Sequence, residues 1–303
     1  GRASLNTNST GDYNVAIGTG SLIENTTANN NTAVGYYGLG ANTTGTQNVA
    51  VGANALDANT TASNNTSVGY ASLGSNTTGA NNTALGYAAA SGVTTGIYNT
   101  AIGNDTGSAI TTGTRNTILG NNSSSVLTTG NYNTIVGSYN EVSASGAEHQ
   151  KVLGYGVTGA NGATIFGNGS TDSSIADGAT SITAPSDVRL KEDIQDEEVG
   201  LDFINELRPV TFRWKKAKDV PSEMKVHDPD SDERVMNGKY NHGFIAQEVK
   251  EVIDNHNLKE GFEMWQEDEA DGRQRIGEAA LMSVMVKAVQ ELSAQVEALE
   301  SQP

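Results

Sequence analysis

One glycine position returns every 17 residues along the first half of the chain. The nine glycines are Gly18, Gly35, Gly52, Gly69, Gly86, Gly103, Gly120, Gly137 and Gly154. The residue four positions before each of the first eight is an asparagine, from Asn14 to Asn133. Strict repeats of about 20 residues are typical of solenoids, in which each repeat forms one coil that stacks on the next. The repeat predicts a β solenoid, because a disordered segment of similar composition has no reason to keep a register.

Each repeat opens with a short alternating block such as Thr32–Gly35, which predicts a strand. The second residue of the block is small and is expected to face inward. The third residue is aliphatic, and we expect these residues to form a ladder inside the roll: Ile17, Val34, Val51, Val68, Leu85, Ile102, Leu119, Val136 and Leu153. A second short stretch, such as Gly38-Leu39, is expected to form another strand. The interval shortens to 13 residues before Gly167, so the last coil is expected to be shorter.

A pair of threonines recurs with the same period and predicts a polar corner. The pairs are Thr26-Thr27, Thr43-Thr44, Thr60-Thr61, Thr77-Thr78, Thr94-Thr95, Thr111-Thr112 and Thr128-Thr129. Stacked coils place like residues about 4.8 Å apart, so asparagine and threonine ladders are expected to satisfy backbone groups at the corners. The same surface is also compatible with a sugar-binding face, an ice-binding array or a passive spacer. Tyr36, Tyr70 and Tyr87, directly after repeat glycines, offer rings for stacking on sugars or for filling gaps between chains.

Composition excludes several classes of site. The chain of 303 residues has no cysteine, so disulfides and thiolate metal sites are absent. Its net charge of -17 argues against a nucleic-acid partner. The histidines His149, His227 and His256 form no metal-binding spacing, and neither a metal nor another cofactor is expected. No long apolar run or signal peptide is found, so membrane insertion is not expected.

The character of the sequence changes near Ala184-Pro185-Ser186. The segment before this point is built from small and polar residues, whereas the segment after it is rich in charge and reads as an ordinary globular domain. We therefore predict three parts: a β-roll over 1–170, a linker with a cleavage junction over 171–185, and a small α+β domain over 186–303. One thin roll holds few apolar groups, which favours several chains packed side by side.

The repeat blocks NTAVGYYGLGANTTG and NVAVGANALDANTT resemble the NTAVG-type repeats of phage tail-fibre and bacterial surface proteins. More loosely, they resemble the left-handed β-roll heads of trimeric autotransporter adhesins. The resemblance covers about 14–170. It implies a homotrimer of parallel β-rolls and identifies no ligand.

The second part is expected to contain a helix over 201–207, a strand over 210–214 and a polar loop over 217–238. His242 leads into a helix that reaches about 254, and a long helix is expected over 278–300. One face of this last helix carries Leu281, Met285, Ala288, Leu292, Gln295 and Leu299 at heptad spacing, with one polar layer. Met282, Val286, Val289, Ser293 and Val296 form a second row beside it. A parallel coiled coil is predicted, with a helix packed on its own domain as the alternative.

Four segments in this order resemble the C-terminal intramolecular chaperone of phage tailspikes, tail fibres and endosialidases. They are SDVRLKEDI, LDFINELRPVTFRWK, HGFIAQEV and LMSVMVKAVQELSAQVEAL. The resemblance covers nearly all of 186–303. It implies a domain that brings three chains together, helps the β-structured stalk to fold in register, and then cuts itself off through a Ser-Lys dyad.

The residues at the start of this segment suit such chemistry. Ser186 is the predicted nucleophile and Lys191 the predicted general base, since a neutral lysine amine can take the proton of a serine hydroxyl. Attack of the Ser186 hydroxyl on the carbonyl of Pro185 predicts cleavage before Ser186, and cleavage on its other side ranks lower. Arg189 is expected to favour the neutral amine of Lys191, and Asp187 to oppose it. These two residues and His242 are candidates to line the site, although Ser186 also fits a helix cap.

Together these features predict the distal segment of a phage tail fibre, in a virion assembled in the bacterial host cytoplasm. The predicted enzyme is a self-cleaving serine peptidase that turns over once and acts on no external substrate. The stalk is a candidate for host attachment through a glycan or protein receptor. A trimeric glycan-binding adhesin of a cell surface and a passive structural spacer remain as alternatives.

Overall fold

The structure is a computed structural model that describes residues 1–179, 182–183, 186–258, 262, 264–267, 272–277 and 280–302. The chain divides into two compact units, Gly1–Leu190 and Lys191–Pro303. The first unit is a β solenoid, and the second is a small α+β unit that ends in a long helix.

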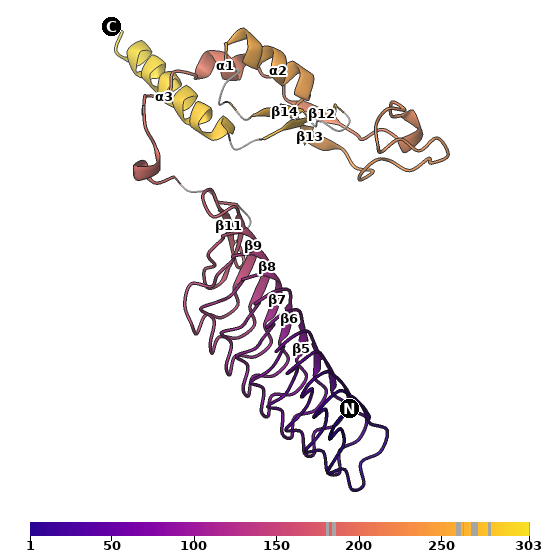
Figure 1. Cartoon of the computed structure of the whole chain (residues 1–303). Coiled ribbons are helices and arrows are strands. Elements are labelled where there is room, and N and C mark those ends of the chain that lie inside the picture. The colour runs from indigo at the N-terminus through magenta and orange to yellow at the C-terminus, as the bar shows by residue number, and fades with distance from the viewer. Residues whose placement is uncertain are drawn as a thin grey trace. The chain divides into compact units, whose positions relative to one another are not determined.

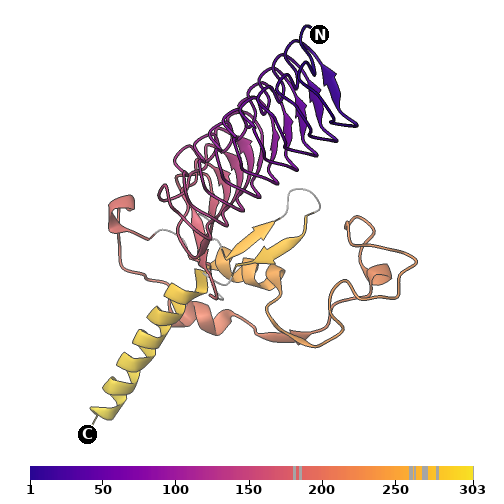
Figure 2. The same ribbon diagram turned by 90° about the horizontal axis from the view of Figure 1, so that it is seen from below.

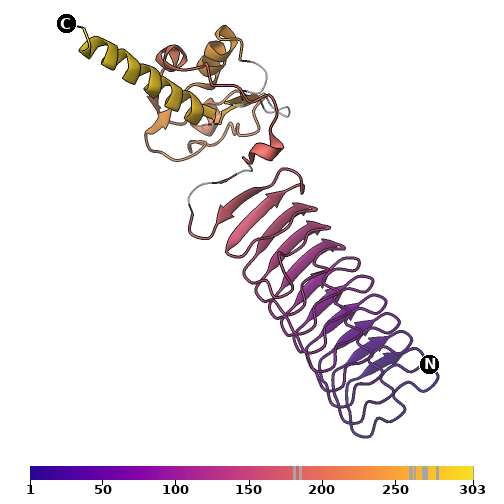
Figure 3. The ribbon, with the colours of Figure 1, turned by 90° about the vertical axis from the view of Figure 1, so that its left-hand side faces the viewer.

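The first unit is a solenoid of about nine turns whose strands stack in sequence order into one 11-stranded sheet (Figures 1 and 3). Its strands are β1 (Val15–Ile17), β2 (Thr32–Val34), β3 (Val49–Val51), β4 (Thr66–Val68), β5 (Thr83–Leu85), β6 (Thr100–Ile102), β7 (Thr117–Asn121), β8 (Thr134–Ser138), β9 (Lys151–Tyr155), β10 (Ala163–Gly167) and β11 (Ser173–Ala176). Strands β1 to β10 are parallel, and β11 turns back antiparallel to β10. The predicted solenoid is therefore confirmed.

The strand register follows the repeat. Ala16 pairs with Ala33, one period later, and the same offset holds along the roll. At the last coil Gly154 pairs with Gly167, which confirms the shortened interval. The sheet then continues through β11, inside the segment 171–185 that the sequence suggests as a linker.

The repeat glycines have a backbone conformation that other residues rarely adopt. Their φ angles lie between +123° and +142°. A Cβ atom added at Gly86 would overlap the carbonyl group of Gly103 on the next coil, and the other repeat glycines face the next coil in the same way. The period is therefore fixed by backbone contact between coils as well as by side-chain packing.

The predicted inner ladder of aliphatic residues is wrong. The second residue of each strand from β2 to β9 is buried, as at Ala33, Ala50 and Ala84, whereas the third residue faces outward. Ile17 is 59% exposed and Leu85 is 46% exposed. Neighbouring side chains of a strand point to opposite faces, so a small inward residue forces the aliphatic residue after it outward.

Leucines from a turn fill the interior instead. Leu22, Leu39, Leu56 and Leu73 are fully buried and lie one period apart. Each has a φ angle of about +50°, so this stretch is a turn with left-handed residues. The second strand predicted near Gly38-Leu39 does not form. Burial of the leucine side chain offsets a backbone conformation that costs about 1–3 kcal/mol for a residue other than glycine.

Three rows of inward-facing residues change in side-chain size and polarity along the axis of the solenoid. The leucine row continues as Ala90, Gly107 and Ser124. A buried asparagine row, Asn25, Asn42, Asn59 and Asn76, continues as Val93, Ile110 and Leu127. The small strand residues give way to Ile118, Ile135 and Val152. Each loss of volume is met by a gain in a neighbouring row, as a close-packed interior requires.

The predicted asparagine and threonine ladders are confirmed. The Asn48 backbone N–H donates to Asn31 Oδ1 over 2.9 Å, and Asn48 Nδ2 donates to the carbonyl of Ala62 over 2.9 Å. At the corner, Thr43 Oγ1 donates to the carbonyl of Thr60 over 3.1 Å. These bonds recur in successive coils and satisfy backbone groups that a thin roll cannot otherwise pair.

The second unit contains α1 (Leu201–Glu206), β12 (Val210–Phe212), β13 (Asn241–Gly243), α2 (Ala246–Asn255), β14 (Trp265–Glu267), β15 (Gln274–Ile276) and α3 (Leu281–Glu300). Strand β12 pairs antiparallel with β13, and β14 with β15. A long connection between β12 and β13 extends away from the helices (Figures 1 and 2). Phe203 and Met264 are fully buried in the core of this unit, with α1, α2 and α3 around it.

Candidate self-cleavage site

Ser186 and Lys191, the predicted dyad, lie at the border of the two units. Ser186 precedes a short 3-10 helix, Val188–Leu190, and belongs to the first unit. Lys191 is the first residue of the second unit. Both residues are exposed. Pro185, on the other side of the predicted scissile bond, lies outside the described residues.

Exposure of both residues has a chemical consequence. Burial favours the neutral form of an amine, which is the form that accepts a proton from a serine hydroxyl. A single chain leaves Ser186 and Lys191 in contact with water. The burial that would favour a neutral amine at Lys191 is therefore not provided within one chain.

Asp187 and Arg189 form an ion pair beside Ser186. Arg189 Nε donates to Asp187 Oδ1 over 3.0 Å, and the Arg189 backbone N–H donates to the same oxygen over 2.9 Å. The hydrogen bond from the Arg189 side chain lowers the pKa of Asp187 and raises the pKa of Arg189. The positive charge of Arg189 is thus balanced by Asp187. The sequence-based expectation treated the two charges as separate influences on Lys191, whereas here they offset one another.

His242 lies on β13 in the second unit. Its Nδ1 atom is 3.3 Å from the Thr211 hydroxyl on the paired strand β12. The imidazole borders a hollow of about 570 Å³ with Phe212, Trp214 and Phe244 among its walls. His242 is thus a strand residue beside an apolar hollow.

The inner face of α3 packs on its own unit. Leu281, Val284 and Ala288 are buried, and α3 lies against α1. The Glu291 carboxylate accepts a hydrogen bond from the Leu201 backbone N–H over 2.8 Å, at the start of α1. An acidic side chain stabilises a helix N-terminus by about 0.3–1 kcal/mol. Since Leu281 and Ala288 are occupied within the chain, the predicted heptad seam that includes them is wrong.

The neighbouring, solvent-facing side of α3 carries an apolar row that shares Met285, Leu292 and Leu299 with the predicted seam. Its members are Met282, Met285, Val289, Leu292, Val296 and Leu299. They are spaced 3-4-3-4-3 and are 45–67% exposed. Unlike the predicted seam, this row contains no polar layer. Sequence reasoning missed it because two apolar rows run along the helix and only contact with α1 decides which one is free.

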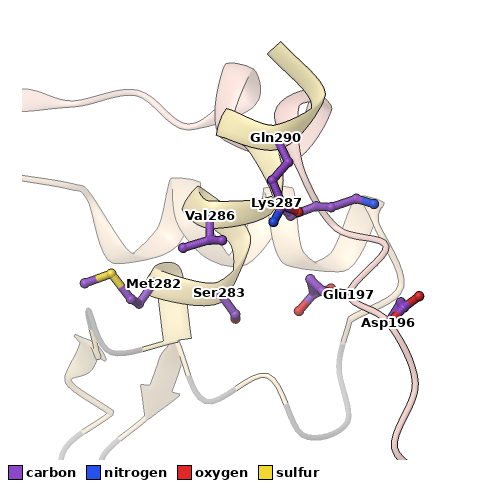
Figure 4. Close-up of a pocket in the computed structure, with 7 residues that line it drawn as sticks. All are labelled: Asp196, Glu197, Met282, Ser283, Val286, Lys287 and Gln290. Carbon is purple, nitrogen blue, oxygen red and sulfur yellow. The ribbon is translucent and has the colours of Figure 1, made fainter. Parts of the chain in front are cut away.

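A hollow of about 620 Å³ lies along this outer face (Figure 4). Met282 and Val286 form its apolar wall, and Ser283, Lys287 and Gln290 of the same helix flank them. Asp196 and Glu197, from the segment before α1, lie opposite. The hollow contains neither predicted dyad residue.

Comparison with known protein families gives one match, a peptidase family model described as chaperone of endosialidase, over residues 186–258. Residues 186–258 are thus similar to the chaperone-of-endosialidase family. This similarity and the solenoid together fit a tail fibre with a C-terminal chaperone domain. No curated protein and no solved structure gave a match.

The bounds of the match bear on the site. It begins at Ser186, the predicted nucleophile, and includes Lys191 and His242. It ends at Leu258, so α3 follows the matched segment. The chaperone family therefore supports the first three segments of the resemblance, and the role of α3 rests on its own geometry.

Within the described ranges, no three His, Cys, Asp or Glu side chains gather where they could hold a metal ion. Over the same residues, every helix is too short or too polar to span a bilayer.

Proposed function

We propose that the chain is the distal part of a phage or prophage tail fibre, in which the chaperone domain joins three copies in register and is then released by cleavage before Ser186. The observation that carries this proposal is the start of the chaperone match at Ser186, where the repetitive solenoid has ended. A cut there separates a finished fibre from the domain that assembled it.

The repeats of the solenoid do not fix the register between neighbouring chains, so another part of the chain must set it. Its outward residues repeat with the strand period, so two chains offset by one coil still place threonine beside threonine and aliphatic beside aliphatic. A non-repetitive domain at one end removes this ambiguity and raises the local concentration of the chains. The outer row of α3 is the proposed contact between them. Val286, which is 52% exposed, lies beside that row and widens the apolar strip, which favours a bundle of more than two helices.

The proposed cleavage is an acyl shift followed by hydrolysis. Ser186 Oγ attacks the carbonyl carbon of Pro185 while Lys191 takes the hydroxyl proton. The C–N bond between the two residues breaks, and the proton passes to the departing amine of Ser186. An ester then joins Pro185 to Ser186 Oγ, and water hydrolyses it to a Pro185 carboxylate and a free hydroxyl. The exposure of both dyad residues in one chain supports a reaction that waits for assembly.

The test is whether a Ser186→Ala variant is cleaved, as judged by a denaturing gel and by mass spectrometry of the intact protein. The unmodified chain is expected to give two fragments, the second with Ser186 at its N-terminus. Ser186→Ala and Lys191→Met are expected to remain intact, while Ser170→Ala, at an exposed serine of the preceding stretch, is cut as usual. A fragment that begins at Ser186 when Lys191 is Met, or any cut Ser186→Ala chain, contradicts the dyad.

A second candidate function is receptor binding by the solenoid. The Tyr70 and Tyr87 rings stack with centroids 5.4 Å apart, and both remain about half exposed. Exposed tyrosine rings of this kind stack on sugar rings. Glycan-array binding that is lost in a Tyr70→Ala/Tyr87→Ala variant, and kept in Thr78→Ala, supports attachment. A stalk that binds no glycan and no host surface is a spacer.

A further inference from the structure

The outer face of the solenoid sheet carries no charge over its first eight strands. The first and third residues of each strand point outward. They are Val15, Thr32, Val49, Thr66, Thr83, Thr100, Thr117 and Thr134 in one row, and Ile17, Val34, Val51, Val68, Leu85, Ile102, Leu119 and Val136 in the other. None of the 16 is buried. The first charge on this face is Lys151 on β9, which pairs with Asp177 over 2.8 Å.

The other charged residues of the roll lie elsewhere. Arg2, Glu24, Asp57 and Asp105 lie in turns, and the others lie outside the named strands: Asp12, Arg115, Glu141, Glu148 and Asp172. The aliphatic row therefore runs along a surface of the sheet that carries no charge from β1 to β8. Solvent alone gives no reason for this, because a lysine or glutamate at an outward strand position is ordinarily tolerated.

The size of the strip suits contact with another chain. Nine coils at about 4.8 Å give a length of roughly 40 Å, and two outward rows are about 10 Å wide with their side chains. Each chain therefore exposes about 400 Å² on this face. Three such faces that meet around an axis would remove about 1,200 Å² from water in total, or about 400 Å² for each pair of chains. This is less than a specific interface of two chains buries alone, so the strip acts together with the proposed contact along α3.

We propose that this face is the surface through which the solenoids of three copies pack, parallel and in the same register. The inference rests on the proposed assembly of three chains and adds the surface that joins their stalks. A second copy fits because its aliphatic rows have the same spacing, so each coil meets its own equivalent. A soluble glycan or a charged protein surface lacks this match, because neither repeats an apolar group at every coil.

Cysteine cross-linking on the full chain tests the surface, since the natural sequence has no cysteine to interfere. Leu85→Cys lies on the proposed face, and Thr78→Cys lies at an exposed corner seven residues earlier. A disulfide requires Cα atoms within about 7 Å. Mild oxidation is expected to cross-link most Leu85→Cys chains, and at least five-fold more than Thr78→Cys chains. A mixture of Leu85→Cys and Val68→Cys chains with different tags is expected to give no mixed product, because equivalent coils meet.

A second variant pair measures the cost of charge on the face. Leu85→Lys/Val136→Lys is expected to weaken association of the chain by at least ten-fold in sedimentation. Thr78→Lys/Thr129→Lys, at exposed corner positions, is expected to leave it unchanged. Far-ultraviolet circular dichroism serves to show that both variants keep the roll.

The outcomes separate this inference from the proposed assembly. A chain that sediments as a monomer overturns both. A chain that sediments as a trimer, with Leu85→Cys no more cross-linked than Thr78→Cys, overturns the interface and leaves the chaperone proposal standing. Strong cross-linking of the mixed Leu85→Cys and Val68→Cys chains overturns the common register.

Discussion

At the scale of single residues, the solenoid depends on glycines whose conformation no other residue adopts without strain. The sequence alone identifies these positions, because their spacing is regular and glycine is the usual choice for a positive φ angle. Which neighbour stands against each glycine is a matter of three-dimensional stacking. The carbonyl group of the next coil occupies the place of a side chain.

Gly86→Ala is expected to destabilise the roll by at least about 2 kcal/mol, because the added methyl group meets the Gly103 carbonyl at a φ angle of +137°. Urea unfolding followed by circular dichroism measures this change. Gly156→Ala is the matched control, since Gly156 also has a positive φ angle but no atom within 4 Å of the added carbon. We expect a loss of only about 1 kcal/mol there. Equal losses at the two sites would contradict the contact argument.

The end of the buried asparagine row gives a second prediction. Asn59 Oδ1 accepts a hydrogen bond from Asn76 Nδ2 over 3.0 Å, whereas Asn76 Oδ1 has no hydrogen-bond partner among the described residues because Val93 follows it. Asn76→Val should therefore cost less than Asn59→Val, by about 1 kcal/mol. Denaturant midpoints of the two variants test the order. A larger loss for Asn76→Val would show that its donor bonds outweigh the unpaired oxygen.

At the scale of elements, the sequence predicted the strands and helices better than it predicted which sides they bury. Alternation correctly placed small residues such as Ala33 inside, yet the aliphatic residues that follow were assigned to the core. The same difficulty arose at α3, where Leu281 and Met282 begin two neighbouring apolar rows. Periodicity defines a face, but only the packing partner decides whether that face is internal.

The outer row of α3 is expected to hold chains together without supporting the fold of one chain. Val289→Glu places a charge in the middle of this row and should weaken self-association by at least ten-fold. Gln290→Glu adds the same charge one residue later, outside the row, and should leave self-association nearly unchanged. Sedimentation equilibrium of the two variants measures the difference. If both associate like the natural chain, this face of α3 is not a contact.

The loop between β12 and β13 contains a charge cluster with a defined pH dependence. Lys216 and Lys218 lie 2.6 and 2.7 Å from Asp232, and their hydrogen bonds lower the pKa of Asp232 to about 2. Because this value lies below the ordinary 3.8, the contribution of the cluster to stability is complete above about pH 4 and is lost as pH falls through about 2.

Carbon NMR of the Asp232 carboxyl group measures that titration. In a Lys216→Met/Lys218→Met variant the midpoint is expected to rise towards 3.8, since both hydrogen-bond donors are gone. A midpoint that stays low in this variant would point to another cause.

At the scale of the whole molecule, the coil is the unit of structure. Deletion of residues 66–82 removes one complete period, so Thr83–Leu85 should pair directly with Val49–Val51. Such a chain is expected to fold with one coil fewer and with little change in melting temperature. Removal of only 66–78 shifts every later residue out of register and should lower the melting temperature sharply. Thermal unfolding of the two deletions tests this, and similar melting of both would contradict it.

The candidate site could be predicted only in its sequence position. The segment around Ser186 predicted the chaperone domain, which the family match confirms. The pairing of Asp187 with Arg189 and the exposure of Lys191 depend on backbone conformation and on the surrounding chain. In the proposed function the environment of Ser186 and Lys191 is completed by further copies of the chain, and a single sequence does not describe that environment.

Between Asn76 and Val93 the buried rows change their residue types, and this change affects how a gene for such a solenoid can gain repeats. Coils that precede the change share one interior pattern, so a duplicated copy among them meets a matching neighbour on both sides. If a coil were copied to the other side of this change, two large residues, or two small ones, would lie in the same layer of the solenoid interior. Lengthening by recombination is therefore expected within each half of the roll, and the coils between Asn76 and Ile118 should stay single copy.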